Sequence, residues 1–367
     1  MTIGIVTFFK SYNYGVWLQA IATQQFFLKN GYKAHIINYT NVLEDSKTQY
    51  AYKEHDKFYG YVTSFIKSIL FGKVKYYKRG FAQYLDNYYV LSPQKYHDIE
   101  DMQNIEYDVL VAGSDQLWNP ETTSGILDKV FLLQFGKAKK HISIATSIGS
   151  TPIDSENGKI ISEALESFDA ISVREQYAVN ELHRFCDFPI KVIMDPTFLL
   201  DKNDWIEIAQ TNRNISIDSH AKYILTYFIS TDKRSERYQK IVENYSKKFN
   251  LPVWAIQFSC APSTPCDKII VGASISDFIN LIVDAALIIT DSFHGVALSL
   301  NLNANFIAVT NKSNPERVRF LLEQVALSDR IEKRPENYTP IDYSIVNEKL
   351  NLLKYNSQAW ILTAINR

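Results

Sequence analysis

Short apolar runs alternate with segments of helical spacing along almost the whole chain. Runs typical of buried strands occur in the first half at 3–9, 34–39, 109–112, 142–145, 171–173 and 191–194. The second half repeats them at 223–229, 253–257, 287–290 and 306–309. Helical spacing lies between or after these runs, chiefly at 14–31, 156–168, 177–185, 296–302 and 343–367. Strands that alternate with helices predict an α/β fold, and two such series predict two domains with parallel sheets.

We expect the two domains to meet at about residue 200, where the polar run 201–204 begins. Residues 1–200 then form an N-terminal Rossmann-like domain, and residues 201–367 form a C-terminal one. Gly31 is placed to end the first helix in a left-handed cap. The first βαβ unit lacks the Gly-x-Gly-x-x-Gly turn of dinucleotide-binding enzymes, so an oxidoreductase of that class is disfavoured.

Residues 41–104 differ from the rest of the N-terminal half. They are rich in Tyr, Lys and Phe and show no clear strand pattern. We predict a mainly helical insertion over the N-terminal cleft. Its aromatic side chains either stack on sugar rings or pack the helices. They include Tyr50, Tyr52, Phe58, Tyr59, Tyr61, Tyr76 and Tyr77.

A polar cluster follows each of five predicted strands. The clusters lie at 11–15, 113–119, 174–175, 195–197 and 291–295. Ligands of open α/β sheets bind outside the carboxyl ends of the strands, so these clusters predict one or two facing clefts. In the last cluster, Asp291 or Ser292 can cap the following helix, whose free N–H groups favour a phosphate or carboxylate beside His294. The alternative is that Ser292 is only a cap and His294 a hydrogen-bonded core residue.

Composition narrows the classes of partner. The 39 Lys and Arg residues balance 40 Asp and Glu, and the net charge of −1 offers no general attraction to nucleic acid. The three cysteines lack the spacing of a metal site, so we expect no bound metal. No apolar stretch approaches the roughly 20 residues of a membrane span, so membrane contact is peripheral at most. The first residues show no secretory signal, and we expect a cytoplasmic protein.

The polar clusters also carry a family resemblance. Their motifs are Asn13-Tyr14-Gly15 with Leu18-Gln19-Ala20, Ala112-Gly113-Ser114-Asp115-Gln116 with Trp118-Asn119, Ser172-Val173-Arg174-Glu175, Asp195-Pro196-Thr197 and Thr290-Asp291-Ser292-Phe293-His294-Gly295. The ordered set resembles the polysaccharide pyruvyl transferase family, from Ile3 to about Arg330. The resemblance implies a fold similar to two-domain GT-B glycosyltransferases, with a terminal helix that crosses back to the first domain. It also implies transfer of pyruvate from phosphoenolpyruvate onto a sugar as a cyclic ketal.

A donor that carries a phosphate and a carboxylate needs cationic contacts. Arg174 can bind such groups bidentately and matches the arginine of the family's Val-Arg-Glu motif. Many family members also place an arginine where this chain has Ser292, so the phosphate contact has to come from elsewhere, for example from Arg317. We therefore expect the donor site to include Arg174, Ser292, Phe293, Gly295, Arg317 and Arg319. The alternatives are an ion pair of Arg174 with Glu175 or Asp195, and a solvated face for the other two arginines.

Ketal formation needs a group that gives and takes protons near neutral pH. His294 is the one histidine that lies in a polar turn between a predicted strand and a predicted helix, and we expect it to be the general acid or base. Asp115 orients an acceptor hydroxyl or acts as a base; the alternative is that it caps the turn after its strand. The expected acceptor is a saccharide, either a lipid-linked oligosaccharide or a nucleotide sugar, and no cofactor is expected besides phosphoenolpyruvate as co-substrate. Its expected contacts are Asn13, Tyr14, Gln19, Ser114, Gln116 and Trp118.

Two other functions remain open at this point. A GT-B glycosyltransferase that uses a nucleotide sugar would share the fold and the cleft. It would be stabilised by a nucleotide and not by phosphoenolpyruvate. A non-catalytic sugar-binding module would use the cleft and the aromatic side chains, but it would not need the positions of Arg174 and His294.

Overall fold

The computed structural model describes most of the chain. The described residues are 1–10, 13–41, 88–123, 125–211, 215, 222–230, 232–257, 262–310 and 315–366. Most of the predicted insertion, with the seven aromatic residues named above, therefore lies outside the described residues.

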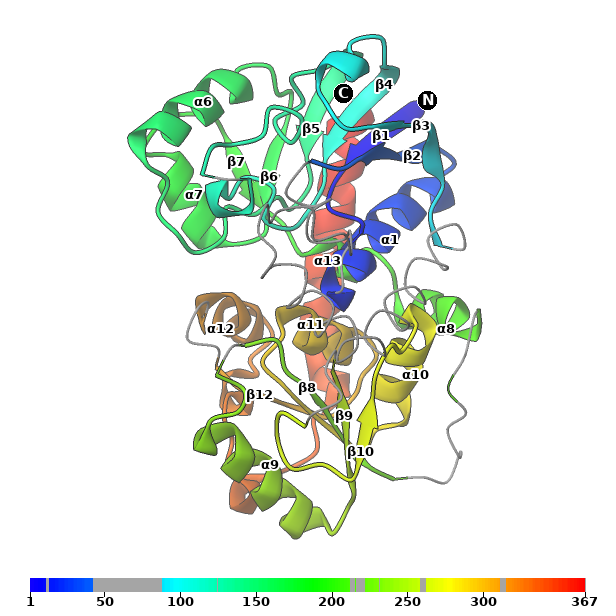
Figure 1. Ribbon diagram of the computed structural model, residues 1–367, viewed down its shortest axis with the longest axis vertical. Coiled ribbons are helices and arrows are strands. Elements are labelled where there is room, and N and C mark those ends of the chain that lie inside the picture. The colour runs from blue at the N-terminus through cyan, green and yellow to red at the C-terminus, as the bar shows by residue number, and fades with distance from the viewer. Residues whose placement is uncertain are drawn as a thin grey trace, which may run out of the picture.

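The first half of the chain forms a five-stranded parallel sheet with the order β3-β2-β1-β4-β5 (Figure 1). Its strands are β1 (Thr2–Val6), β2 (Lys33–Tyr39), β3 (Leu91–Tyr96), β4 (Glu106–Ala112) and β5 (Lys137–Ser143). A parallel pair, β6 (Ile171–Val173) and β7 (Ile190–Val192), lies next to β5, where the Ser143 N–H donates to the Ala170 carbonyl at 3.0 Å. The helices are α1 (Tyr14–Lys29), α6 (Ser155–Leu165) and α7 (Gln176–Leu182).

The second half repeats this arrangement with the order β10-β9-β8-β11-β12, again all parallel. Its strands are β8 (Ile224–Tyr227), β9 (Val253–Ile256), β10 (Lys268–Ile270), β11 (Leu287–Thr290) and β12 (Phe306–Ala308). Its helices are α8 (Lys202–Gln210), α9 (Glu236–Phe249), α10 (Ile275–Asp284), α11 (Phe293–Asn301) and α12 (Pro315–Gln324). Both sheets place their first strand at the centre, as Rossmann-like sheets do. The predicted α/β fold with two parallel sheets is confirmed.

The edge strands are where sequence patterns were least informative. The prediction of a strand-free insertion at 41–104 is wrong in its last part, because β3 lies there and pairs with β2. Its sequence, Leu-Ser-Pro-Gln-Lys-Tyr, lacks an apolar run, and Pro93 is tolerated because β3 is an edge strand. The three-residue edge strand β10 was likewise not predicted. Five single 3₁₀ turns complete the described structure, at Glu100–Met102, Pro120–Thr122, Pro196–Phe198, Ser328–Arg330 and Pro335–Asn337.

The last helix, α13 (Tyr343–Asn366), runs from the second half of the chain to the first and contacts both (Figure 1). At its start the Tyr343 hydroxyl donates to the Ala304 carbonyl at 2.6 Å. Further along, the Ser357 hydroxyl accepts from the Met194 N–H at 3.0 Å, and near the end the Lys140 ammonium donates to the Ile365 carbonyl at 3.0 Å. Among the described helices, none combines the length and the apolar character that a bilayer crossing requires.

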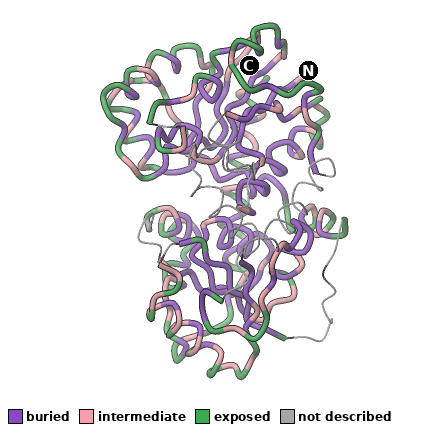
Figure 2. The backbone as a smooth tube through the Cα atoms, viewed as in Figure 1, coloured by how far each residue is buried: buried purple, intermediate pink, exposed green. Residues whose placement is uncertain are grey.

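The first turn of α1 joins the two halves. Tyr14 belongs to α1 but is fully buried in the core of the second half, where it stacks on Phe278 with a centroid distance of 4.3 Å. Its hydroxyl donates to the Ala273 carbonyl at 2.8 Å, and the Tyr227 hydroxyl donates to Asn13 Oδ1 at 3.3 Å. Figure 2 shows continuous burial through this junction. The carboxyl ends of β1 and β8 are thereby held close to each other.

Candidate active site

The loop after β4 is tightly held at Ser114 and Asp115. Asp115 has φ of 77°, a left-handed conformation that aspartate adopts more readily than most residues. Its carbonyl accepts from the Ser147 N–H at 2.8 Å, and the Ser114 hydroxyl donates to the Ala145 carbonyl at 3.0 Å. This backbone geometry turns the Asp115 carboxylate towards Arg174.

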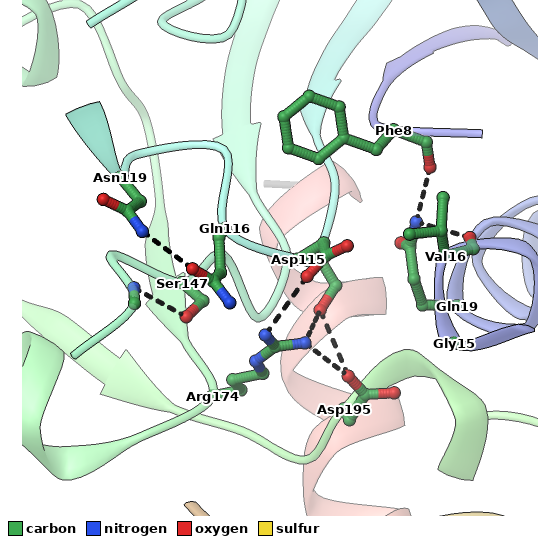
Figure 3. Close-up of polar contacts among 12 residues, drawn as sticks. Phe8, Gly15, Val16, Gln19, Asp115, Gln116, Asn119, Ser147, Arg174 and Asp195 are labelled. Atoms are coloured by element: carbon green, nitrogen blue, oxygen red, sulfur yellow. Dashed lines mark hydrogen bonds and ion pairs between the residues drawn. The ribbon is translucent and has the colours of Figure 1, made fainter. Parts of the chain in front are cut away.

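Arg174 follows β6 and is surrounded by carboxylates (Figure 3). Its Nη1 donates to Asp195 Oδ2 at 3.0 Å, its Nε to Glu175 Oε2 at 3.3 Å, and its Nη2 to Asp115 Oδ1 at 3.4 Å. Nη1 also donates to the Ser114 hydroxyl at 3.3 Å. Only 1% of the Arg174 side chain is exposed. The ion pairs with Glu175 and Asp195, which the sequence left as the alternative to donor binding, are therefore present.

These carboxylates hold Arg174 in its charged form. Burial by itself lowers the pKa of a guanidinium, but the charges of Glu175, Asp115 and Asp195 outweigh burial and raise the pKa of Arg174. Neighbouring groups outweigh burial at Asp195 as well, but there the pKa shifts in the opposite direction. Burial raises its pKa, yet the facing His294, Arg174 and the Thr197 N–H together bring the pKa well below its usual range.

Asp195 connects this cluster to the second half of the chain. It caps the 3₁₀ turn Pro196–Phe198, and its Oδ1 accepts from the Thr197 N–H at 3.0 Å and the Thr197 hydroxyl at 2.8 Å. Its Oδ2 accepts from Arg174 and from the Ser114 hydroxyl at 3.2 Å. The same oxygen lies 3.5 Å from Nε2 of His294. One buried carboxylate thus lies between a guanidinium and an imidazole.

His294 lies in the first turn of α11. Ser292 caps this helix, since its hydroxyl accepts from the Gly295 N–H at 3.2 Å, whereas Asp291 accepts from Ile229 and Ser230 instead. The other side of the imidazole packs on α1. A Cβ atom at Gly15 would lie 2.0 Å from His294 Nδ1, so only glycine leaves room for the ring there.

Arg317, on α12, has a different environment from Arg174. Its guanidinium lies over the Phe293 ring at 5.0 Å from the centroid, and that of Arg174 lies 5.4 Å from the same centroid. Among the described residues, Arg317 makes no ion pair, and its buried Nε has no hydrogen-bond partner. Burial and the charge of Arg174 lower the pKa of Arg317 to about 10, so the group is still charged at neutral pH. An unpaired, desolvated cation of this kind is a site for an anion.

A cavity of about 20 Å³ separates the two arginines. Its lining includes Arg174, Asp195, Phe293 and Arg317. This volume is enough for about one water molecule, so a larger anion requires the lining side chains to move apart.

Four side chains expected to contact the acceptor are fully buried: Tyr14, Gln19, Ser114 and Trp118. Gln19 Nε2 donates to the Phe8 and Val16 carbonyls at 2.8 and 2.9 Å, which fixes the loop after β1. The Trp118 indole donates to the Phe131 carbonyl at 3.1 Å and packs in the core. Its burial is contrary to the expected contact of Trp118 with the acceptor.

The other expected contacts differ in how close they lie to the cluster. Asn13, whose Oδ1 accepts from the Gly15 N–H at 3.0 Å, caps α1 beside His294. Gln116 is partly exposed and accepts from Asn119 at 2.7 Å. Gly295 packs against Thr290, where a Cβ would meet Oγ1 at 2.6 Å. Arg319 lies on the exposed face of α12, 4.0 Å from Glu316, and does not join the group.

The sequence that builds this site matches the model of a known protein family. The model for polysaccharide pyruvyl transferase matches residues 13–313. The chain belongs to this family. The matched stretch includes Arg174, Asp195 and His294, whereas Arg317 lies just beyond it. In this member of the family, the motif segments around Gly15, Asp115, Arg174, Asp195 and His294 come together in space.

Solved structures of other enzymes show a distant likeness over the whole chain. The UDP-GlcNAc 2-epimerase from Methanocaldococcus jannaschii has a TM-score of 0.46 and 13% identity, covering 97% of this chain and 100% of that one. The glycosyltransferase SnogD from Streptomyces nogalater has a TM-score of 0.44 and 10% sequence identity, and the match covers 100% of this chain and 99% of that one. A glycosyltransferase from Rickettsia africae ESF-5 has a TM-score of 0.45 and 12% sequence identity, and the match covers 100% of this chain and 99% of that one. A sequence search of curated proteins gives no match.

Two acidic residues of the site, Asp195 and Glu175, were missing from the sequence-based set. Both stand in clusters that follow predicted strands, and that position was the available signal. Glu175 accepts from Arg174 and from the Ser147 hydroxyl at 2.5 Å, so it anchors the loop after β5. Their contacts with residues more than 20 positions away could not be inferred from local patterns.

Proposed function

We propose that this pyruvyl transferase moves the pyruvyl group of phosphoenolpyruvate onto two hydroxyls of a sugar in a polysaccharide precursor. The product is a cyclic ketal, and His294 is the general acid and base. The observation that carries the proposal is the position of His294 between Asp195 and Gly15, across the Phe293 ring from the unpaired Arg317. A proton-transfer group and an anion-binding group thus lie together where the carboxyl ends of both sheets meet.

The donor phosphate is held mainly by Arg317 in this proposal. Ser292 stands where many family members have an arginine, and its hydroxyl is already used to cap α11. Arg317 approaches the same turn from α12 and has no ion-pair partner among the described residues. Arg174 contributes a second positive charge on the same ring, although its hydrogen bonds go to carboxylates.

The chemistry needs two proton movements. Protonation of the donor's methylene carbon turns it into a methyl group and leaves C2 electron-poor, so that a first sugar hydroxyl forms a C–O bond there. A second hydroxyl then displaces phosphate from C2 and closes the ketal ring. Of the two hydroxyl protons released, one balances the proton on the methyl group and the other leaves with phosphate. A single imidazole that both gives and accepts protons serves these steps.

Acceptor binding is assigned to the accessible polar groups at the same edge. Asp115 has 15% of its side chain exposed, and Asn13 and Gln116 are partly exposed. Carboxylate and amide groups can hydrogen-bond sugar hydroxyls. The buried Tyr14, Gln19, Ser114 and Trp118 position these loops instead.

The test is incubation with phosphoenolpyruvate and a panel of acceptors, both lipid-linked oligosaccharides and nucleotide sugars. We expect release of inorganic phosphate together with a product whose mass has gained a pyruvyl group. Thermal shift with each donor is the matched control for the glycosyltransferase alternative. Stabilisation by a nucleotide but not by phosphoenolpyruvate, with no ketal product from any acceptor, would overturn the proposal.

A further inference from the structure

The two ring nitrogens of His294 have different surroundings. Nε2 is buried, and its nearest acceptor among the described residues is Asp195 Oδ2 at 3.5 Å. This distance is a few tenths of an ångström beyond a normal hydrogen bond. Nδ1 lies on the opposite side of the ring, beside the Cα of Gly15. The imidazole is therefore oriented by one carboxylate and one close backbone contact.

The Asp195 carboxylate has little freedom to turn away from the imidazole. Its Oδ1 accepts from the N–H and the hydroxyl of Thr197, and its Oδ2 accepts from Arg174. The side chain is fully buried. Three donors thus fix the plane of the carboxylate before His294 is considered.

The charge of Asp195 is also secured. Although burial favours the neutral acid, His294, Arg174 and the Thr197 N–H bring the pKa of Asp195 well below its usual range. An ionised carboxylate only accepts hydrogen bonds, so it favours the imidazole tautomer that carries its proton on the facing nitrogen.

We propose that Asp195 is a positioning residue for His294, which holds Nε2–H and leaves Nδ1, beside Gly15, as the nitrogen that exchanges the catalytic proton. This inference rests on the proposed function, because it takes His294 as the acid and base. It assigns Asp195 a part in the reaction that the family match alone does not specify.

The proton step has a definite balance. When a sugar hydroxyl attacks C2, the lone pair of Nδ1 forms the new N–H bond. The oxygen keeps the electron pair of its former O–H bond and uses an electron pair to form the C–O bond. The resulting imidazolium is stabilised by the negative charge of Asp195 on its other nitrogen. The imidazolium then returns the proton from Nδ1, either to the methylene carbon of the next donor or to the leaving phosphate.

Gly15 is consistent with this assignment. Position 15 requires glycine for a reason other than its backbone conformation. Gly15 lies inside α1, and no left-handed φ is recorded for it. What requires glycine is the close approach of Nδ1, which a Cβ atom would meet at 2.0 Å. The missing side chain therefore leaves room for the imidazole, which packs against the α1 backbone at this position.

The first test is Asp195→Asn, which keeps the size of the side chain and removes its charge. We expect turnover to fall by about 10²-fold or more, a loss in the range of a misoriented catalytic histidine.

A double-mutant cycle with His294→Gln separates positioning from general stability. If Asp195 acts through His294, Asp195→Asn costs no further turnover in the His294→Gln background. The matched control is Asp277→Asn, which removes an equally buried carboxylate from the first turn of α10 and should leave turnover near the wild-type value. Equal losses from Asp195→Asn in both backgrounds would overturn the inference.

A measurement on the wild-type protein keeps the inference testable if Asp195→Asn does not fold. In ¹⁵N NMR spectra of histidine-labelled protein, with His294→Gln used for assignment, neutral His294 should carry its proton on Nε2. A proton on Nδ1 would refute the assignment. The two proposals fail in different experiments. The NMR spectrum tests the tautomer of His294, whereas the proposed function fails if a stable His294→Gln enzyme retains near-normal turnover.

Discussion

Arg174 and Arg317 lie over the same phenylalanine ring, yet their surroundings are opposite. Arg174 belongs to the first half of the chain and contacts three carboxylates and a hydroxyl. Arg317 belongs to the second half, and among the described residues it has no ion-pair partner. The pKa of the first is raised by its neighbours, and the pKa of the second is lowered to about 10 by burial and by Arg174.

The difference separates two uses of a buried charge. A guanidinium whose donors are already bound to carboxylates fixes the geometry of those carboxylates, here Asp115, Glu175 and Asp195. A guanidinium that is desolvated without a partner costs free energy in the folded protein, and an anionic ligand can relieve that cost. We therefore expect loss of the first arginine to reduce stability, and loss of the second to reduce donor binding.

The largest effect should come from His294, which contacts the same Phe293 ring as the two arginines. His294→Gln keeps a hydrogen-bonding side chain but cannot shuttle a proton, so turnover should fall by about 10²–10⁴-fold. Steady-state kinetics at saturating donor measures the loss, and thermal unfolding is the control. If the variant unfolds early and its lost activity follows the unfolded fraction, His294 is a structural histidine and not a catalytic one.

Arg174→Met should be the most destabilising of the arginine substitutions. It leaves three buried or partly buried carboxylates without their common partner, and breaking a buried pair costs about 3–5 kcal/mol of unfolding free energy. Chemical denaturation measures this at neutral pH. Arg174 helps to hold the pKa of Asp195 well below its usual range, so part of the loss should disappear in acid, where Asp195 takes up a proton more readily in the variant than in the wild type. A loss that is unchanged between neutral and acid pH would contradict the ion-pair explanation.

Arg317→Met should separate binding from stability. Loss of a charged hydrogen bond to the phosphate weakens donor affinity by about 10- to 100-fold, or roughly 1.5–3 kcal/mol. The free energy of unfolding should be unchanged or raised by about 1 kcal/mol, because a desolvated cation is replaced by an apolar side chain. Isothermal titration with phosphoenolpyruvate and denaturant unfolding give the two quantities. Donor affinity equal to that of the wild type would remove Arg317 from the site.

Arg319→Met is the control from the same helix and should have the smallest effect. Arg319 is half exposed and lies 4.0 Å from an exposed Glu316, an arrangement that contributes little to stability. Donor affinity should change less than about twofold, within the range of an outer, screened charge. A loss as large as that of Arg317→Met would show that net charge on α12, and not the position of Arg317, governs donor binding.

Several features of this protein followed from the sequence because they depend on neighbours along the chain. The central strands of both sheets were predicted near their observed positions, since buried strands need continuous apolar runs. Helix α1 follows its capping residue Asn13 and ends before Gly31, whose φ is 83°. The polar clusters were predicted at strand ends, and those around Arg174, Asp195 and His294 meet there in the fold.

Other features depended on contacts between distant segments. The edge strands β3 and β10 have too few buried positions to show a pattern, and their pairing partners define them. The sequence presented Arg174 and Arg317 as similar donor-binding candidates, and Trp118 as an accessible indole. Only the packing of the chain showed which arginine is paired and that the indole is enclosed.

The sequence by itself determined the alternation of strands and helices, the positions of the polar turns and the family to which they point. Periodicity and capping act over a few residues, so local patterns suffice for these features. The tertiary structure alone decided that Asp195 joins Arg174 to His294, and that Gly15 leaves space for the imidazole. Desolvation and pairing of charges are set by groups that are close in space, and these groups come from segments far apart in the chain.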